Sequence, residues 1–430
     1  MLVDVAIAVP GAAPFTYDVP AELSGAIRPG VRVRVPFGTG QRIGWVTDFR
    51  ESSDRAIKPV LEVLDQEPVL APELLNLTRW IARYYRCGWA EAIKAALPPG
   101  MDARQVKTVF ANERLGRDPA GLSADRRLID FLREHGTASY DYIIKKYGRR
   151  GAADLALLRR HGLIGIYHVW QKAKVAAKRE RWLAARDGEF SNVRARAQMK
   201  LWRLLRERSA LPPAELRTAR AAAHKLVTLG LAAWEQRTVD RLPDAPDLAE
   251  DAEGIRLTGE QERFHRSVSE DIGRRAFSVR LLLGVTSSGK TELYLRAAKE
   301  TLAVGRDVLI LVPEIGLTHQ MVSRVGRALG EAAVLHSEMG SGERFDAWRL
   351  IREKRFRVVV GTRSAVFAPL DDIGLVVVDE EQDQSYKQED CRPFYNARDT
   401  AIVRAKAHGA VVILGSATPS VESFHKAVSG

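Results

Sequence analysis

An eight-residue loop carries the clearest chemistry in the sequence. Residues 284–291 read Gly-Val-Thr-Ser-Ser-Gly-Lys-Thr and fit the pattern G-x-x-x-x-G-K-[ST]. In such a loop the backbone N–H groups face a phosphate at a helix N-terminus, the lysine reaches the β- and γ-oxygens, and the last hydroxyl binds Mg²⁺. We predict that ATP is bound by Gln261 and by the loop residues Gly284, Thr286, Ser288, Gly289, Lys290 and Thr291, with Thr291 also a Mg²⁺ ligand.

A second group of candidate catalytic residues follows an apolar run about 90 residues later. Val376, Val377 and Val378 lead directly into Asp379, Glu380 and Glu381. Ligands of open α/β sheets gather at the carboxyl ends of the strands, so these acids fall where a nucleotide would lie. We predict that Asp379 holds Mg²⁺, that Glu380 orients and deprotonates the attacking water, and that Lys290 completes the catalytic set.

A third motif, Gly415-Ser416-Ala417-Thr418-Pro419, follows the apolar run Val411–Leu414. Short hydroxyl side chains at this position can sense a γ-phosphate, so Ser416 and Thr418 are predicted sensors. The order of the phosphate loop, the Asp-Glu acid motif and this pentapeptide is typical of superfamily 2 nucleic-acid motors.

The elements that must position these motifs are apolar strands alternating with helical stretches. Such alternation, with strands apolar enough to be buried on both faces, favours a parallel α/β sheet. The predicted strands are 279–283, 308–312, 333–335, 358–360, 375–378 and 411–414.

Charge and composition narrow the class of protein. Lys and Arg number 66 against 54 Asp and Glu, and residues 101–243 contain 30 of these bases against 15 acids. A local basic surplus is typical of proteins that contact a phosphate backbone, although a merely solvated basic face remains an alternative. No apolar run approaches the ~20 residues of a membrane helix, and no basic segment opens a secretory signal. We expect a cytoplasmic protein that binds DNA and no membrane.

Cys87 and Cys391 are the two cysteines of the chain. Their separation matches neither a disulfide framework nor a paired zinc site, so we predict two unpaired thiols.

The length of 430 residues exceeds what one core supports, since single cores stop growing near ~250 residues. We predict an α/β multidomain protein: a small β-rich N-terminal domain, a basic winged-helix-like middle, and a RecA-like lobe with a parallel sheet. Between the two basic segments, the charged run 171–196 is expected to be a solvated helix or a linker, and a plain helical bundle is an alternative for the middle. The predicted domains are 1–105, 106–175, 176–243 (a basic helical linker or a second winged helix) and 244–430.

The sequence resembles the primosomal replication-restart helicases of bacteria, the primosomal protein N′ family. The shared residues in the C-terminal part are 284–292, 311–318, 335–337, 343–344, 361–365, 379–381 and 385–388, and those in the N-terminal part are Phe15, Tyr17, 32–38, 43–44 and Lys58.

This resemblance implies an ATP-dependent helicase that unwinds DNA 3′ to 5′ and promotes primosome assembly at forked DNA. It implies that the N-terminal domain holds a 3′-terminal nucleotide, and that single-stranded DNA-binding protein and loaders of the replicative helicase are partners. The residues it assigns to DNA contacts are Phe15, Thr16, Gly38, Lys58, Thr362, Arg363, Tyr386 and Lys387.

Three residues depart from the family pattern. Thr16 stands where an acid is usual, Gln382 replaces a histidine, and Ser287 replaces a glycine. The Cβ of Ser287 should be tolerated if the local φ is negative. The resemblance also implies a second lobe with an arginine finger and a zinc-binding insertion, neither of which this sequence contains. We therefore expect this polypeptide to bind ATP·Mg²⁺ and DNA but to hydrolyse ATP slowly, without unwinding. The alternatives are a non-motor nucleotide-binding DNA scaffold and a different superfamily 2 translocase.

Overall fold

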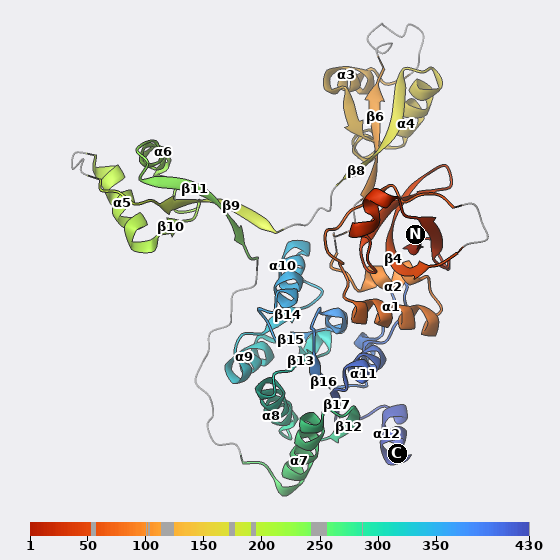
Figure 1. The fold of residues 1–430 in the computed structure, drawn as a ribbon, viewed down its shortest axis with the longest axis vertical. Helices are drawn as coiled ribbons and strands as arrows, with labels where there is room; N and C mark the ends of the chain where they lie inside the picture. The colour runs from red at the N-terminus through yellow and green to blue at the C-terminus, as the bar shows by residue number, and fades with distance from the viewer. Residues whose placement is uncertain are drawn as a thin grey trace. The chain divides into compact units, whose positions relative to one another are not determined.

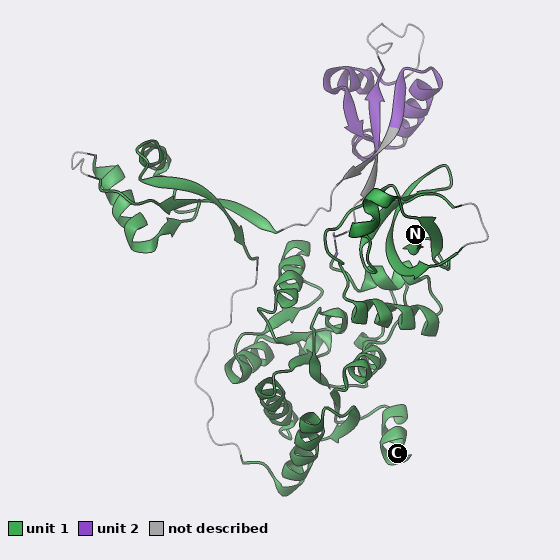
Figure 2. Ribbon diagram, in the orientation of Figure 1, with its two compact units in different colours: residues 1–98, 177–430 green, residues 99–176 purple. Residues whose placement is uncertain are grey.

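The computed structural model describes residues 1–52, 57–99, 101, 104–112, 124–171, 177–190, 195–241, 256–285 and 287–429. The chain divides into two compact units, one formed by Met1–Pro98 with Ala177–Gly430 and the other by Pro99–Ala176 (Figure 2). No helix in these described ranges is both long enough and apolar enough to span a bilayer.

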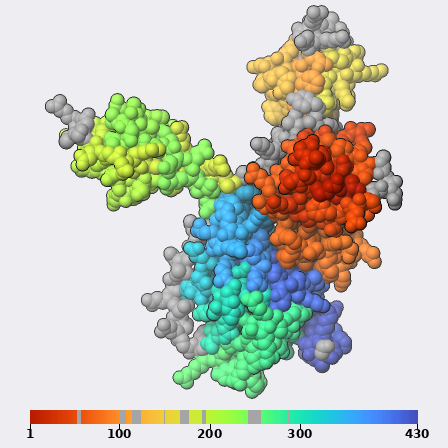
Figure 3. Space-filling view, in the orientation of Figure 1, coloured from red at the N-terminus to blue at the C-terminus, as the bar shows by residue number. Residues whose placement is uncertain are grey.

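The first 98 residues form a five-stranded antiparallel sheet followed by two helices (Figure 1). Val31, Val33 and Val35 are fully buried, which confirms the alternating pattern read from the sequence. The sheet order is β2-β1-β4-β3-β5, with strands β1 (Leu2–Ile7), β2 (Phe15–Asp18), β3 (Arg32–Phe37), β4 (Gly40–Arg50) and β5 (Glu62–Val63), a 3-10 helix at Ala21–Ala26, and helices α1 (Pro72–Tyr84) and α2 (Trp89–Ala95). The space-filling view shows this segment as a continuous body, coloured red to orange (Figure 3).

The two basic middle segments share one arrangement of elements. Each runs strand, helix, short strand, helix, strand, and each forms a three-stranded antiparallel sheet with its first strand in the centre. The first contains β6 (Arg104–Ala111), α3 (Arg126–His135), β7 (Thr137–Ser139), α4 (Tyr140–Arg160, kinked at Gly148) and β8 (Ile164–Gln171); the second contains β9 (Lys178–Ala185), α5 (Arg196–Arg208), β10 (Ala210–Leu211), α6 (Arg220–Thr228) and β11 (Ala232–Val239).

Strand β9 corrects one expectation from the sequence. The charge run 171–196 suggested a solvated helix or linker, yet Lys178–Ala185 pairs antiparallel with the whole of β11. Leu183 on β9 is fully buried in the core of this segment, so one apolar position anchors an otherwise charged strand.

The C-terminal part contains a six-stranded, wholly parallel sheet in the order β12-β17-β16-β13-β15-β14. This confirms the predicted parallel α/β lobe. Its strands are β12 (Ser278–Leu283), β13 (Asp307–Leu311), β14 (Ala333–Leu335), β15 (Val358–Gly361), β16 (Ile373–Val378) and β17 (Val411–Ser416). Its helices are α7 (Gly259–Arg274), α8 (Lys290–Ala303), α9 (His319–Leu329), α10 (Ser341–Arg352), α11 (Ala397–His408) and α12 (Val421–Ser429), with 3-10 turns at Glu314–Gly316, Arg363–Phe367 and Gln384–Tyr386.

Helix α11 contacts helix α1 of the N-terminal segment through a buried ion pair. Arg404 is fully buried, and its Nε lies 3.1 Å from Glu73 Oε1. Burial raises the pKa of Glu73, but Arg404 and His408 outweigh that effect and hold it below its usual value. At the start of α11, the backbone N–H of Asn396 donates to the Tyr85 hydroxyl at 3.1 Å.

At the opposite edge of the parallel sheet from the phosphate loop, Arg306 joins three loops. Its side chain donates to Asp372 Oδ1 and to the main-chain carbonyls of Ile373, His408 and Gly409. With 1% of its surface exposed, Arg306 has exchanged water for these acceptors.

We expect Arg306→Met to lower the free energy of unfolding by about 3 kcal/mol, because it leaves three main-chain carbonyls without the donor that replaces water there, and the half-exposed Asp372 without its ion-pair partner. The free energy of unfolding is measured by urea titration, with unfolding followed by circular dichroism. Lys354→Met is the control, since Lys354 and Asp371 form an ion pair exposed to solvent and its loss should leave the midpoint unchanged. Equal midpoints for all three proteins would contradict the role given to Arg306.

Candidate ATP-binding site

The phosphate loop lies between β12 and α8, as the sequence predicts. Gly289 adopts φ +87° and α8 begins at Lys290. A Cβ on Gly284 would lie 2.5 Å from Ser288 Oγ, so a side chain there would force the Ser288 hydroxyl to move. Thr286, one of the predicted ATP contacts, lies outside the described residues.

Ser287 overturns the condition placed on it from sequence. Its φ is +62°, in the left-handed region, and not negative. This conformation is sterically unfavourable for an L-residue with a Cβ, which explains why glycine suits the position. The loop keeps its curled form with the serine in place.

Lys290 connects the loop to the acid motif. Its Nζ donates to the Gly284 carbonyl at 2.7 Å and lies 3.5 Å from Glu380 Oε1, with 9% of the residue exposed. Strands β12 and β16 flank β17, so the loop after β12 and the acids after β16 share one edge of the sheet. The predicted catalytic residues Lys290, Asp379 and Glu380 therefore come together at that edge.

Two buried tyrosines fix Asp379. The Tyr294 hydroxyl donates to Asp379 Oδ1 at 3.0 Å, and the Tyr386 hydroxyl donates to the Asp379 main-chain oxygen at 2.6 Å. Burial raises the pKa of Asp379, and the neighbouring Glu380 adds to that, while Tyr294 and Lys290 oppose it. A hard cation would offset the same desolvation, so a Mg²⁺ ion fits this carboxylate together with the Thr291 hydroxyl at the start of α8.

Glu380 has φ +45°, an uncommon conformation for a residue with a side chain. Strained backbone of this kind is concentrated at functional positions, where the surrounding contacts enforce it. Here the Gln382 side-chain amide donates to Glu380 Oε2 at 3.0 Å, and Lys290 Nζ lies 3.5 Å from the other carboxylate oxygen, Oε1.

Gln382 also receives a hydrogen bond from the Ser-Ala-Thr motif. Ser416 Oγ donates to Gln382 Oε1 at 2.6 Å, and the Thr418 N–H donates to Ser416 Oγ at 2.9 Å. A carboxamide donates and accepts at once, so Gln382 joins Glu380 to Ser416 despite departing from the family's histidine. The predicted sensors Ser416 and Thr418 are thereby linked to the predicted base.

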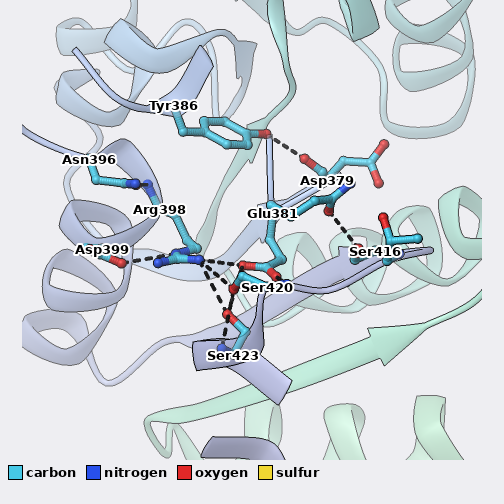
Figure 4. A network of polar contacts seen from close by, with 11 residues as sticks. Asp379, Glu381, Tyr386, Asn396, Arg398, Asp399, Ser416, Ser420 and Ser423 are labelled. Atoms are coloured by element: carbon cyan, nitrogen blue, oxygen red, sulfur yellow. Dashed lines mark hydrogen bonds and ion pairs between the residues drawn. The ribbon is translucent and has the colours of Figure 1, made fainter. Parts of the chain in front are cut away.

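The third acid of the motif, Glu381, lies at the centre of a buried network. Arg398 from α11, with Ser420 and Ser423 at the start of α12, converges on its carboxylate (Figure 4). The Arg398 Nη1 lies 2.7 Å from Oε2, and the Ser420 N–H donates to Oε1 at 2.7 Å. Burial raises the pKa of Glu381, but the bonds from Ser420, Arg398 and Ser423 outweigh it and hold that pKa below its usual value. Sequence reasoning gave no role to Glu381 or Arg398.

Gln261 and the predicted DNA contacts of the lobe are also placed by hydrogen bonds. Gln261 caps α7 and donates from Nε2 to the Ser288 carbonyl at 2.8 Å, so it supports the phosphate loop. Arg363 donates to the Lys387 carbonyl at 2.7 Å. Tyr386 is fully buried and Thr362 is 4% exposed, so in this structure neither presents a DNA-facing side chain.

In the N-terminal segment, Phe15 contacts Phe37, the residue that precedes Gly38, whereas Thr16 points away. Phe15 meets Phe37 edge to face at 5.2 Å between ring centroids, next to the exposed Gly38. Thr16 points to the other face of the sheet, where its hydroxyl donates to Asp4 Oδ1 at 2.8 Å. Lys58 is exposed, and its carbonyl accepts from the Asp18 N–H.

Family models match two parts of the chain. Residues 4–98 match the 3′DNA-binding domain (3′BD) of PriA, and residues 266–427 match the DEAD/DEAH box helicase model.

Curated relatives match the chain over nearly its whole length. The chain is 35% identical to the replication restart protein PriA of Bacillus subtilis, covering 97% of this chain and 53% of that protein. Identity to the PriA proteins of Synechocystis and Haemophilus influenzae is 33% and 32%, covering 96% and 100% of this chain and 51% and 50% of those proteins. The chain therefore spans about half the length of these relatives. A solved structure of RecG bound to a three-way DNA junction matches 40% of this chain and 22% of that one, at 24% identity and a TM-score of 0.31, which is too low to support an argument.

We expect Glu381→Gln to lower the free energy of unfolding at neutral pH by about 3 kcal/mol, because it leaves Arg398 facing a neutral amide. The folded-state pKa of Glu381 lies below its ordinary value of 4.5, so its stabilisation is present above pH ~4.5 and is lost as the pH falls through the folded-state pKa. Urea titrations between pH 4 and 7 should show the difference from wild type shrinking towards the acid end. Glu422→Gln, at an exposed position on α12, is the control, and a difference that does not change with pH would contradict this account.

A second variant tests the bridge between Glu380 and Ser416. Neutral histidine at position 382 can accept from Ser416, whereas the imidazolium cannot, so Gln382→His should make single-turnover ATP hydrolysis fall below pH ~6.5 relative to wild type. The ratio of the two rates across pH 5.5–8 is the measurement. A constant ratio would show that the Ser416 bond has no part in turnover.

Proposed function

We propose that this chain, a relative of the PriA replication restart proteins, is the ATP-binding and DNA-binding part of a 3′-to-5′ helicase that acts at forked DNA. The observation that carries the proposal is the meeting of Lys290 with Glu380 at 3.5 Å, at the edge of a parallel sheet in the part that matches a DEAD/DEAH box helicase. A phosphate loop and a water-activating carboxylate held at this spacing suit hydrolysis of a nucleoside triphosphate.

The chemistry divides among the residues of this edge. The loop amides and Lys290 bind the β- and γ-phosphates. Glu380, held by Gln382, takes the proton of the attacking water. Asp379, held by Tyr294 and Tyr386, would bind Mg²⁺. Mg²⁺, when bound by Thr291 and Asp379, would neutralise charge that develops on the transferring phosphoryl group.

DNA binding is supported by two features. Residues 4–98 match a 3′DNA-binding domain, and residues 101–243 carry twice as many basic as acidic residues. We assign the 3′-terminal nucleotide to Phe15, Gly38 and Lys58, where an aromatic ring, an open backbone and an ammonium group suit a base, a sugar and a phosphate. Single-stranded DNA-binding protein and loaders of the replicative helicase are the partners that go with this role.

Slow hydrolysis by the 430-residue polypeptide itself is part of the proposal. In the described part of the chain, the cation placed beside Glu380 is Lys290. Phosphate-loop enzymes gain roughly 10³–10⁵ in rate from a further arginine at the γ-phosphate. A non-motor scaffold that holds nucleotide as a structural ligand is the competing function, and hydrolysis stimulated by DNA would argue against it.

Two variants test the proposal by separating its two halves. Lys290→Ala should weaken binding of a fluorescent ATP analogue with Mg²⁺ at least tenfold and leave DNA affinity unchanged, because Lys290 supplies the charge at the phosphates. Phe15→Ala should weaken DNA binding and leave affinity for the ATP analogue unchanged. It should also lose the preference for a fork with a free 3′-OH at its branch over a fork with a 3′-phosphate. Fluorescence anisotropy measures both. An unchanged nucleotide affinity in Lys290→Ala would refute the motor assignment.

A further inference from the structure

A basic hollow lies within the N-terminal segment, away from the residues assigned to the 3′-terminal nucleotide. It has a volume of about 630 Å³, which falls within the ~300–1,000 Å³ range of ligand pockets. A loop at residues 11–14, the end of β4, and helix α1 with the start of α2 surround it. Four arginines line it: Arg50, Arg79, Arg83 and Arg86.

The spacing of three of these arginines explains why they gather. Arg79 and Arg83 are four residues apart on α1, so they lie along one side of the helix. Arg86 follows the end of α1, where its left-handed backbone (φ +53°) turns the chain, and it lines the same hollow. The opposite side of α1 packs Leu74, Leu77 and Ile81 into the core. Helix α1 therefore presents a basic face to the hollow and an apolar face to the protein.

The hollow is on the other face of the sheet from Phe15. Val5 pairs with Phe15, and both pack with the core cluster on one face. Asp4 pairs with Thr16, so these two residues occupy the opposite face, and Asp4 lines the hollow. A ligand in the hollow thus contacts surface that the Phe15, Gly38 and Lys58 group does not supply.

The charge that remains in the hollow is positive. Its two acids are already matched, since Arg50 Nε lies 2.7 Å from Asp4 Oδ2 and Arg79 Nη1 lies 3.4 Å from Asp48 Oδ2. Within the described ranges, neither Arg83 nor Arg86 has a hydrogen bond or ion pair, and both are exposed to solvent. The guanidinium groups of Arg83 and Arg86 are therefore available to bind an anion.

One further group favours a nucleic-acid strand as that anion. Trp89 also lines the hollow, with the Arg79 guanidinium 5.2 Å from its ring centroid and its indole N–H donated to Thr78. An aromatic ring beside guanidinium groups is a recurrent arrangement for single-stranded DNA, because the ring contacts bases while the charges contact phosphates.

We propose that Arg83 and Arg86, with Trp89 beside them, form a second DNA site that binds the phosphodiester backbone of a single strand, independently of the strand's 3′ end. The site rests on the proposed function in one respect, namely that the chain binds DNA at all. Residues 79–89 supply what the terminal-nucleotide pocket lacks, a contact that any stretch of strand can make.

The test uses the full 430-residue chain, the single variants Arg83→Gln and Arg86→Gln, and their double variant. Arg28→Gln is the matched control, because Arg28 is an exposed arginine of the same segment that lies outside the hollow and faces Glu67. Affinity for a fluorescent 30-nucleotide single strand is measured against KCl concentration, once with a 3′-OH and once with a 3′-phosphate. Thermal melts confirm that the variants fold.

Each arginine that contacts one phosphate should lower the slope of log affinity against log salt by about 0.7, and the double variant by about 1.4. The loss should be equal for the two oligonucleotides, and Arg28→Gln should match wild type. Slopes equal to wild type in all variants overturn the site while leaving DNA binding by the chain intact. A loss confined to the 3′-OH oligonucleotide also overturns it, because these arginines would then serve the terminal nucleotide. Failure of the wild-type chain to bind either oligonucleotide would refute the proposed function itself.

Discussion

The geometry of the ATP-binding edge depends on one buried carboxylate. Glu381 accepts hydrogen bonds from α11 through Arg398 and from the start of α12 through Ser420 and Ser423. It directly follows the two acids that would act on nucleotide and metal, so its anchoring limits where they can move. The ionised form is stabilised only because several donors replace water around it, and removing any of them leaves charge in a dry environment. The acid motif is thus positioned by α11 and the start of α12 as well as by the phosphate loop.

Sequence patterns predicted the parts of the site that are local. The phosphate loop, the acids after an apolar strand and the six parallel strands each leave a signature within a few residues, and the structure places them as expected. Strand β9 was mistaken for a linker because a charged strand buried through Leu183 lacks the usual alternation. A negative φ was the condition under which a side chain at Ser287 was expected to be tolerated, and the tight turn gives Ser287 a positive φ.

The parts that sequence could not predict depend on contacts through space. Tyr294 reads as an ordinary helix residue, yet it lies 85 positions from the carboxylate that it holds. Tyr386 looked like a DNA contact, and burial makes it a support of the same acid. Gln382 departs from the family's histidine, and its hydrogen bond with Ser416 joins positions 34 residues apart in the sequence. In each case the residue type fits several roles, and only the fold selects among them.

The Arg404–Glu73 ion pair has a consequence beyond the local contact. It joins residues 331 positions apart, and breaking it would strand a charge inside the protein. Separation of helix α1 from helix α11 is therefore costly, and the two segments share part of their stability. Any molecule that binds the folded N-terminal segment stabilises it by mass action, and through this pair some of that gain reaches the nucleotide-binding lobe. Ligand binding by the N-terminal segment and the stability of the lobe are thus thermodynamically linked without any change of shape.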